Sequence, residues 1–270
     1  MRRQGVAMAG YALAVSEEEV GRYLLMAELA AAEERHLWEL AGIGPGAVVA
    51  DVGCGPAATS VQLARAVAPG GRVVGVERDR SALEAARAVV SAAGVDVELR
   101  QGEAGGTGLE PGSVDVAVLR HVLAHNGGAE AAIVQHLSDV VRPGGSVYLV
   151  DVDLTAIRQL DADPELDDQV ERYVEFQRRR GNDVSVGLRL RHLLEAAGLE
   201  PLVHEGRYAI VRPPPGMRPP SWAAREAMVA EGVVTAEDVQ RWAAAFERAD
   251  AQTVRPTLFA PTFVAVGRRA

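Results

Sequence analysis

The chain has 270 residues, 48% of them apolar, and is long enough to bury a full hydrophobic core. Its formal net charge is −9 at pH 7, and its longest basic run is the three arginines 178–180. Because proteins that bind DNA or RNA neutralise phosphates with a basic face, this composition argues against a nucleic-acid partner. The sequence contains no lysine, which excludes Schiff-base and lysine-nucleophile chemistry.

The single cysteine, Cys54, excludes an internal disulfide and a zinc cluster and suits a reducing compartment. The first residues, MRRQGVAMAGYALAV, resemble a signal peptide in having bases before an apolar stretch. That stretch is mostly Ala and Gly rather than Leu, and we find no segment long and apolar enough to cross a membrane. We therefore expect a cytoplasmic protein with no membrane partner.

Helical and strand patterns alternate through the first half of the chain. Ser16 and Glu19 form a capping box, and apolar residues at helical spacing predict a helix to about Ala41. Strands are then expected near 48–52, 72–77, 96–101, 114–119 and 146–151, with helices starting near 58, 81 and 129. Such βαβ alternation predicts an open, mostly parallel sheet with helices on both faces.

The pattern changes beyond residue 151. Helices are expected at about 163–180, 187–197 and 222–246, with a strand near 203–211 and a proline-rich turn, RPPPGMRPPSW, after it. The run TLFAPTFVAVGRR predicts a last strand whose start Pro261 places at an edge or bulge. The sequence thus predicts an α/β fold of about seven strands with helical insertions in the C-terminal half. We divide the chain into residues 1–42, 43–152 and 153–270.

The stretch Val49–Ser60, VADVGCGPAATS, leads from a buried strand through glycines into a helix. From Gly53 it satisfies G-x-G-x-x-A, a dinucleotide fingerprint, and Glu77 at the end of the second strand could hold ribose hydroxyls. However, Asp51 lies just before the turn, where an acid would repel a pyrophosphate but attract an ammonium or sulfonium group. A ligand with positive charge therefore fits better.

Taken in order, VADVGCGPA, GVERD, RQGEA and VVRPGGSVYLVD resemble the motifs of class I S-adenosylmethionine-dependent methyltransferases. The resemblance implies a Rossmann-like core over residues 43–152, an N-terminal helical lid over 1–42, and S-adenosylmethionine as cofactor. It implies that Asp51 helps to place the methionine part and that Glu77 binds the ribose hydroxyls. Glu103 stands where many relatives have Asp. The cofactor-binding residues that it implies are Tyr11, Asp51, Gly53, Gly55, Pro56, Glu77, Arg78, Gly102, Glu103, Ala104 and Arg120.

The stretch LRHVLAHNGG follows the fourth strand, where this family has residues near the transferred methyl. His121 and His125 are the candidate catalytic residues, with His125 as a neutral general base for a hydroxyl or amine. An ordinary histidine pKa near 6.5 would make the rate fall below about pH 6. The other interpretation is a histidine that hydrogen-bonds the loop backbone. Two histidines four residues apart could bind a metal, but no cysteine is near and Glu130 belongs to the next helix, so we expect none.

Substrate-binding candidates are Tyr173, Trp222 and Asn126. Tyr173, Trp222, Phe176 and Tyr208 either line a substrate pocket over the carboxyl ends of the strands or pack the insertions against the sheet. For Phe176 and Tyr208 we favour packing.

We therefore expect a methyltransferase that acts on O, N or C of a small organic molecule, of the kind made in natural-product biosynthesis. An NAD-dependent oxidoreductase and a non-catalytic module that binds S-adenosylmethionine are the alternatives. A homo-oligomer is compatible with the sequence.

Overall fold

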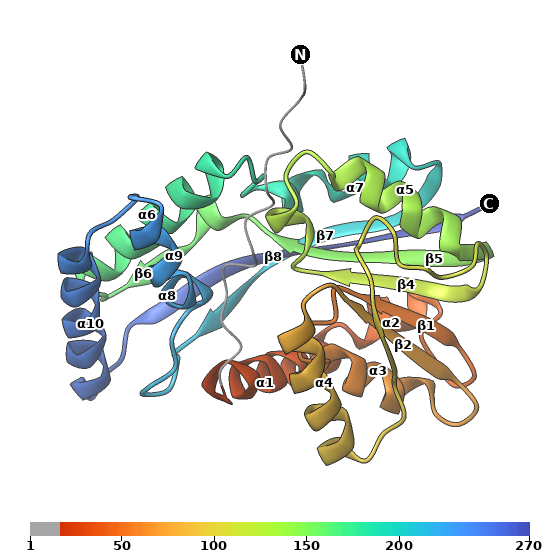
Figure 1. The fold of residues 1–270 in the computed structure, drawn as a ribbon, viewed down its shortest axis with the longest axis horizontal. Helices are drawn as coiled ribbons and strands as arrows, with labels where there is room; N and C mark the ends of the chain where they lie inside the picture. The colour runs from red at the N-terminus through yellow and green to blue at the C-terminus, as the bar shows by residue number, and fades with distance from the viewer. Residues whose placement is uncertain (1–16) are drawn as a thin grey trace.

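The computed structural model describes residues 17–270, so the predicted cap at Ser16 and the candidate Tyr11 lie outside the described residues (Figure 1). The first predicted helix is in fact two, α1 (Glu17–Glu33) and α2 (Arg35–Ala41). The prediction of one continuous helix was wrong because Glu34 leaves helical geometry, with φ −95° and ψ 7°, and turns its carboxylate into the interior.

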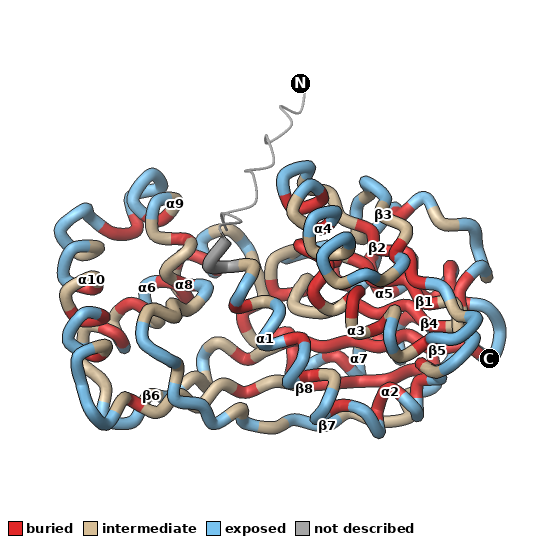
Figure 2. Tube along the Cα trace, turned by 90° about the horizontal axis from the view of Figure 1, so that it is seen from below, coloured by how far each residue is buried: buried red, intermediate tan, exposed pale blue. Residues whose placement is uncertain are grey.

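Five parallel strands form the centre of the sheet. The order is β3-β2-β1-β4-β5, and each neighbouring pair is parallel. Strands β1, β2, β4 and β5 are mostly apolar and buried, as expected where helices cover both faces, whereas the edge strand β3 is polar and has no buried residue (Figure 2). The elements of this half are β1 (Val48–Val52), α3 (Ala58–Val67), β2 (Arg72–Glu77), α4 (Arg80–Ala93), β3 (Glu98–Gln101), β4 (Val114–Arg120), α5 (Glu130–Val140) and β5 (Val141–Val152).

Three further strands complete an eight-stranded sheet: β6 (Arg158–Leu160), β7 (Leu199–Val211) and β8 (Thr257–Arg269). β8 runs antiparallel to β5 on one side and to β7 on the other, and short β6 continues the β5 side. The predicted sheet of about seven mostly parallel strands is confirmed, with β6 added. Pro261 does not lie on an edge strand. It falls in the gap between the β6 pairing, which ends at Phe259, and the β5 pairing, which starts at Thr262.

Helices α1–α4 cover one face of the sheet, and α5 with α7 (Leu190–Ala196) covers the other (Figure 1). The remaining helices gather beyond the amino-terminal end of β8, opposite the C-terminus of the chain (Figure 1). They pack around Trp242, which is fully buried, and Phe176. This helical lobe consists of α6 (Pro164–Arg179), α8 (Pro220–Ala223), α9 (Arg225–Ala230) and α10 (Ala236–Ala251).

Candidate active site

The turn between β1 and α3 is built from positive-φ residues. Gly53 has φ +70°, and a Cβ atom there would lie 2.5 Å from Val122 Cγ2, so only glycine fits between β1 and the loop after β4. Gly55 has φ +53°, but no atom lies within 4 Å of the position of its missing Cβ. Gly53 therefore serves packing, and Gly55 leaves open space where a ligand could approach the backbone.

Two carboxylates lie beside this turn. Asp51 is 1% exposed and accepts a hydrogen bond from Ser60 Oγ at 2.6 Å. Burial raises the pKa of Asp51 to about 6, although the Ser60 hydrogen bond and the positive charge of Arg120 act to lower it. Glu77, the last residue of β2, accepts from the Gly55 N–H at 3.0 Å and from the Asp79 N–H at 2.9 Å. Since each carboxylate oxygen can accept more than one hydrogen bond, Glu77 can still accept hydrogen bonds from the two hydroxyls of a diol.

The turn after β3 continues the same edge of the sheet. Gly102 N–H donates to the Glu77 carbonyl at 3.1 Å, and Glu103 lies 4.0 Å from the Arg78 guanidinium. Ala104 packs partly buried against the core. The predicted cofactor residues of β1, β2 and β3 thus lie along one edge, at the carboxyl ends of neighbouring strands, with Pro56 buried in the first turn.

Cys54 lies within the first turn and is buried. Burial and the nearby negative charges of Asp51 and Glu77 raise the pKa of its thiol well above the usual value. Since the thiolate is the reactive form, this environment disfavours Cys54 as a nucleophile and suits a small packing residue.

Arg120, at the end of β4, is engaged in a buried charge cluster. Its guanidinium binds both oxygens of Glu34, at 2.8 and 2.9 Å, and Glu34 also accepts from Tyr148 Oη at 2.8 Å and from Arg207 at 2.7 Å. Glu34 is 0% exposed; burial alone would raise its pKa, but the Arg120 charge holds it below the usual value. The cluster ties the α1–α2 junction to β4, β5 and β7, and Arg120 is also close enough to Asp51 to influence its charge.

The loop after β4 carries both candidate histidines, with His121 at φ +55° and His125 at the end of a short 3-10 helix, Leu123–His125. Burial lowers the pKa of His121 to about 3, helped by the positive charge of Arg120. Burial also lowers the pKa of His125 to about 4, although a hydrogen bond with Gln177 acts to raise it. The expected pKa near 6.5 was therefore wrong, because desolvation and nearby cationic groups disfavour the charged form of these two half-buried imidazoles, and the pH below which the rate is expected to fall moves to about 4.

The other loop and lobe candidates are held by the protein itself. Asn126 Nδ2 donates to the Val122 carbonyl at 2.7 Å, which closes the loop on itself. Trp222 packs edge-on against Phe246, with ring centroids 5.3 Å apart. Phe176 is fully buried in the lobe, as favoured, whereas Tyr208 on β7 is 52% exposed and does not pack as expected.

Tyr173 is also buried in the lobe, and burial raises the pKa of its phenol to about 12 although it is hydrogen-bonded to Gln177. Sequence patterns did not indicate three of the residues that organise this region: Ser60, Glu34 and Gln177. Ser60 could have been found from its place in the first turn of the helix after Asp51, but the other two carry no such signal. Within residues 17–270 no group of three or more His, Cys, Asp or Glu side chains is placed to hold a metal ion.

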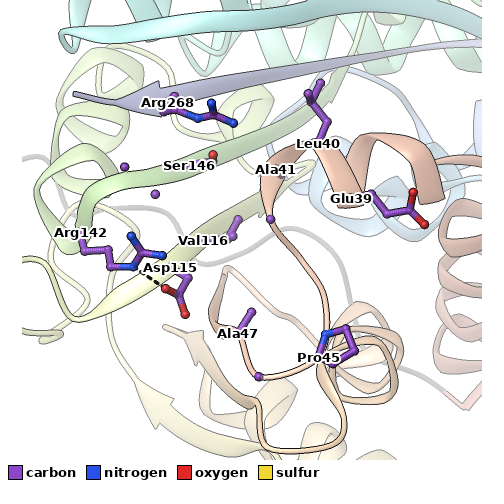
Figure 3. A pocket seen from close by; sticks show the side chains of 14 residues that line it. Glu39, Leu40, Ala41, Pro45, Ala47, Asp115, Val116, Arg142, Ser146 and Arg268 are labelled. Atoms are coloured by element: carbon purple, nitrogen blue, oxygen red, sulfur yellow. Dashed lines mark hydrogen bonds and ion pairs between the residues drawn. The ribbon is translucent and has the colours of Figure 1, made fainter.

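A separate hollow of about 400 Å³ lies at the opposite, amino-terminal edge of β1 and β4 (Figure 3). Arg142 Nε binds Asp115 Oδ1 there at 2.5 Å, and the other Asp115 oxygen accepts the Val48 N–H at 2.6 Å. These charges hold the strand ends together. The hollow is therefore not part of the edge that carries the glycine turn.

Comparison with known proteins agrees with this geometry. Residues 49–145 match the family described as a methyltransferase domain. An uncharacterized 37.1 kDa protein encoded in a transposon of Streptomyces fradiae is 36% identical over 110 residues, which are 40% of this chain and 31% of that protein. The match therefore spans about a third of that relative's length.

Solved structures share the fold over nearly the whole chain. A proposed methyltransferase of Bacillus halodurans is 19% identical, with a TM-score of 0.59, and the similarity covers 88% of this chain and 99% of that one. A proposed sarcosine dimethylglycine methyltransferase of Galdieria sulphuraria is 16% identical, with a TM-score of 0.56, over 96% of this chain and 93% of that one. The [4+2]-cyclase SpnF also has this fold, at 17% identity and a TM-score of 0.54, over 92% of this chain and 81% of that one.

The fold is therefore that of class I methyltransferases. Within it, residues 49–145 match a methyltransferase domain, a family that binds S-adenosylmethionine. The residues present fit that cofactor: Asp51 and Glu77 suit an ammonium group and a ribose diol, and Gly55 borders open space. A pyrophosphate fits poorly beside these two carboxylates.

Proposed function

We propose that this protein transfers the methyl group of S-adenosylmethionine to a small organic molecule. The observation that carries the proposal is the pair of carboxylates, Asp51 and Glu77, on either side of the open turn at Gly55. A cation and a diol are the groups that this pair would bind, through Asp51 and Glu77 respectively. Arg78 and the turn 102–104 would border the adenine.

A small substrate is supported by charge and architecture. The formal net charge of −9 is unfavourable for nucleic acid. The helical lobe around α6 lies beyond the sheet, and such insertions suit an enclosed site for a small molecule (Figure 1). We place natural-product biosynthesis and a cytoplasmic location in the same proposal, with the reduced, buried Cys54 as support for the second. None of the helices described here is both long and apolar enough to span a bilayer.

When bound, the cofactor supplies a sulfonium-activated methyl group, so the chain's own contribution is chiefly to orient the acceptor in line with it. Such positioning can lower the activation free energy by on the order of 7–11 kcal/mol. His125 is neutral at pH 7 and hydrogen-bonded to Gln177, which makes it a fixed hydrogen-bonding group. A pKa of about 4 makes His125 a weak base. It would serve best with an acceptor that ionises easily, such as a phenol or carboxylic acid.

Calorimetry with S-adenosylmethionine, S-adenosylhomocysteine and NAD tests the proposal. We expect S-adenosylhomocysteine to bind tightly and NAD weakly, and the opposite preference would support an oxidoreductase. Glu77→Ala should weaken S-adenosylhomocysteine binding by roughly 1.5–3 kcal/mol, the size of one charged hydrogen bond.

Binding alone does not establish transfer, because a cyclase also has this fold. A radiolabelled methyl-transfer assay over a panel of small phenols, acids and amines is therefore the second measurement. Cofactor binding without transfer to any of them would favour the non-catalytic module.

A further inference from the structure

Helix α6 carries three polar side chains in a row inside the protein. Gln169, Tyr173 and Gln177 are spaced by four residues, so they share one face of the helix. All three are buried, with exposed fractions of 1%, 5% and 3%. Buried polar groups of this kind are expected to be hydrogen-bonded, and each needs a partner.

Two of the three are satisfied by the protein. Gln177 is hydrogen-bonded to His125 and to Tyr173, and its Oε1 accepts from Asn182 Nδ2 at 2.7 Å. Gln177 therefore connects α6 to the loop after β4, where the candidate catalytic residues lie.

Gln169 differs from the other two. Its Oε1 accepts from Ser221 Oγ at 3.2 Å, but its Nε2 has no hydrogen-bond partner among the described residues. A buried donor without a partner is rare and destabilising in a native protein. Turning the carboxamide over would only transfer the deficit to its oxygen. Within residues 17–270 the fold thus holds a buried donor without an acceptor.

The position of Gln169 suggests what would use it. Eight residues of helix separate it from Gln177, which corresponds to about 12 Å along α6. One end of this row contacts His125, and the other end meets Ser221, whose neighbour Trp222 presents an aromatic ring. A molecule lying along α6 would therefore have one end at the loop after β4 and the other at Gln169.

We propose that the Gln169 side-chain nitrogen binds an oxygen of the methyl acceptor, and that this acceptor is an elongated, largely apolar molecule. The oxygen would lie about 12 Å from the end that is methylated. Ser221, the side chain hydrogen-bonded to Gln169, is uncharged, and a single amide N–H suits a neutral oxygen such as that of a ketone or ester. The inference rests on the proposed function, because it gives the substrate class of the same site.

Gln169 is 1% exposed and Ser221 of α8 lies against it, so we assign access for the acceptor to a movement of α8. This helix has only four residues and follows residues 212–219, which form neither helix nor strand. Such a short helix has little stability of its own, so it can open at low cost.

The first test is the thermal stability of Gln169→Leu. Leucine has a similar volume and no donor, but it also removes the acceptor of Ser221 Oγ, so the substitution is made in a Ser221→Ala background, where it should give a higher Tm than Ser221→Ala alone. The matched control is Gln135→Leu on α5, where the glutamine is exposed and its Nε2 already donates to Asp139 Oδ1 at 3.2 Å; its Tm should not rise. A lower Tm for Gln169→Leu in the Ser221→Ala background than for Ser221→Ala alone would show that the fold satisfies the amide itself, and would overturn the proposal.

The second test uses pairs of probes of the same shape, 4-acetylbiphenyl with 4-isopropylbiphenyl and 2-acetylnaphthalene with 2-isopropylnaphthalene. In the presence of S-adenosylhomocysteine, at least one ketone should raise the Tm of the wild-type protein more than its hydrocarbon partner does. Gln169→Leu should remove this preference, with a loss of about tenfold in affinity for the ketone. Equal effects of both partners on the wild-type protein, or no effect of any ketone, would refute the proposal.

Failure of the proposed function is recognised separately. Gln169 lies outside the glycine turn, so Gln169→Leu and the wild-type protein should bind S-adenosylhomocysteine equally in calorimetry. If the wild-type protein does not bind S-adenosylhomocysteine, the ketone and hydrocarbon probes are measured in its absence. Their effects on the Tm then still decide whether Gln169 binds an oxygen.

Discussion

Asp51 offers the sharpest test of the cofactor site, through the substitution Asp51→Asn. The folded protein raises the pKa of this carboxyl from 3.8 to about 6, chiefly by burial. A pKa difference of roughly two units between the folded and unfolded protein corresponds to about 3 kcal/mol in the free energy of unfolding. Because the folded-state pKa is the higher one, the neutral form is preferred in the fold. Stability from this group is fully present below pH 3.8 and is lost as the pH rises through about 6.

Asp51→Asn removes the charge but keeps an oxygen that can accept from Ser60. The variant should therefore be more stable than the wild-type protein above pH 6, by up to about 3 kcal/mol, and the difference should shrink as the pH falls towards 4. Urea unfolding between pH 4 and 8 measures this. The control is Asp96→Asn, an exposed aspartate whose charge remains in water, which should leave the stability unchanged.

The same variant should bind S-adenosylhomocysteine more weakly, because the ligand ammonium loses its carboxylate. In the wild-type protein the affinity should fall by up to about tenfold for each pH unit below 6, as Asp51 takes up a proton. In Asp51→Asn the affinity should be lower and should lack this dependence. A variant that is less stable than the wild-type protein at pH 7.5, or that binds S-adenosylhomocysteine equally well with the same pH dependence, would refute the reasoning.

Three further substitutions test other parts of the site. Glu34→Gln leaves Arg120 buried without its counter-charge and should destabilise the protein by about 3–5 kcal/mol in urea unfolding; a change below 1 kcal/mol would contradict the buried cluster. Gly53→Ala places a methyl group 2.5 Å from Val122 Cγ2 at φ +70°. It should lower the free energy of unfolding by about 1–3 kcal/mol and weaken S-adenosylhomocysteine binding. The control is Gly42→Ala, which has φ +89° but no atom within 4 Å of the new methyl group and therefore carries the backbone strain alone. His125→Ala should lower kcat by about ten- to a hundredfold, the worth of one hydrogen bond, with cofactor affinity unchanged. Since the pKa of His125 is about 4 and its neutral form is the acceptor, the wild-type activity should be present above that pH and lost below it. A fall centred near pH 6.5 that is absent from His125→Ala would contradict the desolvation of this side chain.

Much of the frame was predictable because its signals are local. The apolar runs of β1, β2 and β4 and the turns between them lie within short stretches of chain, and their alternation with helices implies a parallel sheet. The same logic placed Asp51 and Glu77 together, since both end neighbouring parallel strands. Glycine adopts positive φ without strain, which suits Gly53 and Gly55 in this turn, whereas the positive φ of Ala57 has no such signal in the sequence.

The electrostatics of the site depended on the tertiary structure. Glu34 meets Arg120 and Arg207 across 86 and 173 residues of chain, and His125 meets Gln177 on a helix that belongs to a different part of the sequence. Such contacts leave no periodic pattern, because any carboxylate or amide at those positions reads locally as an ordinary helix residue. Burial likewise moved the pKa of His125 from 6.5 to about 4. Desolvation and the nearest charges set that value, and both are properties of the folded surroundings, not of the histidine or its neighbours in the chain.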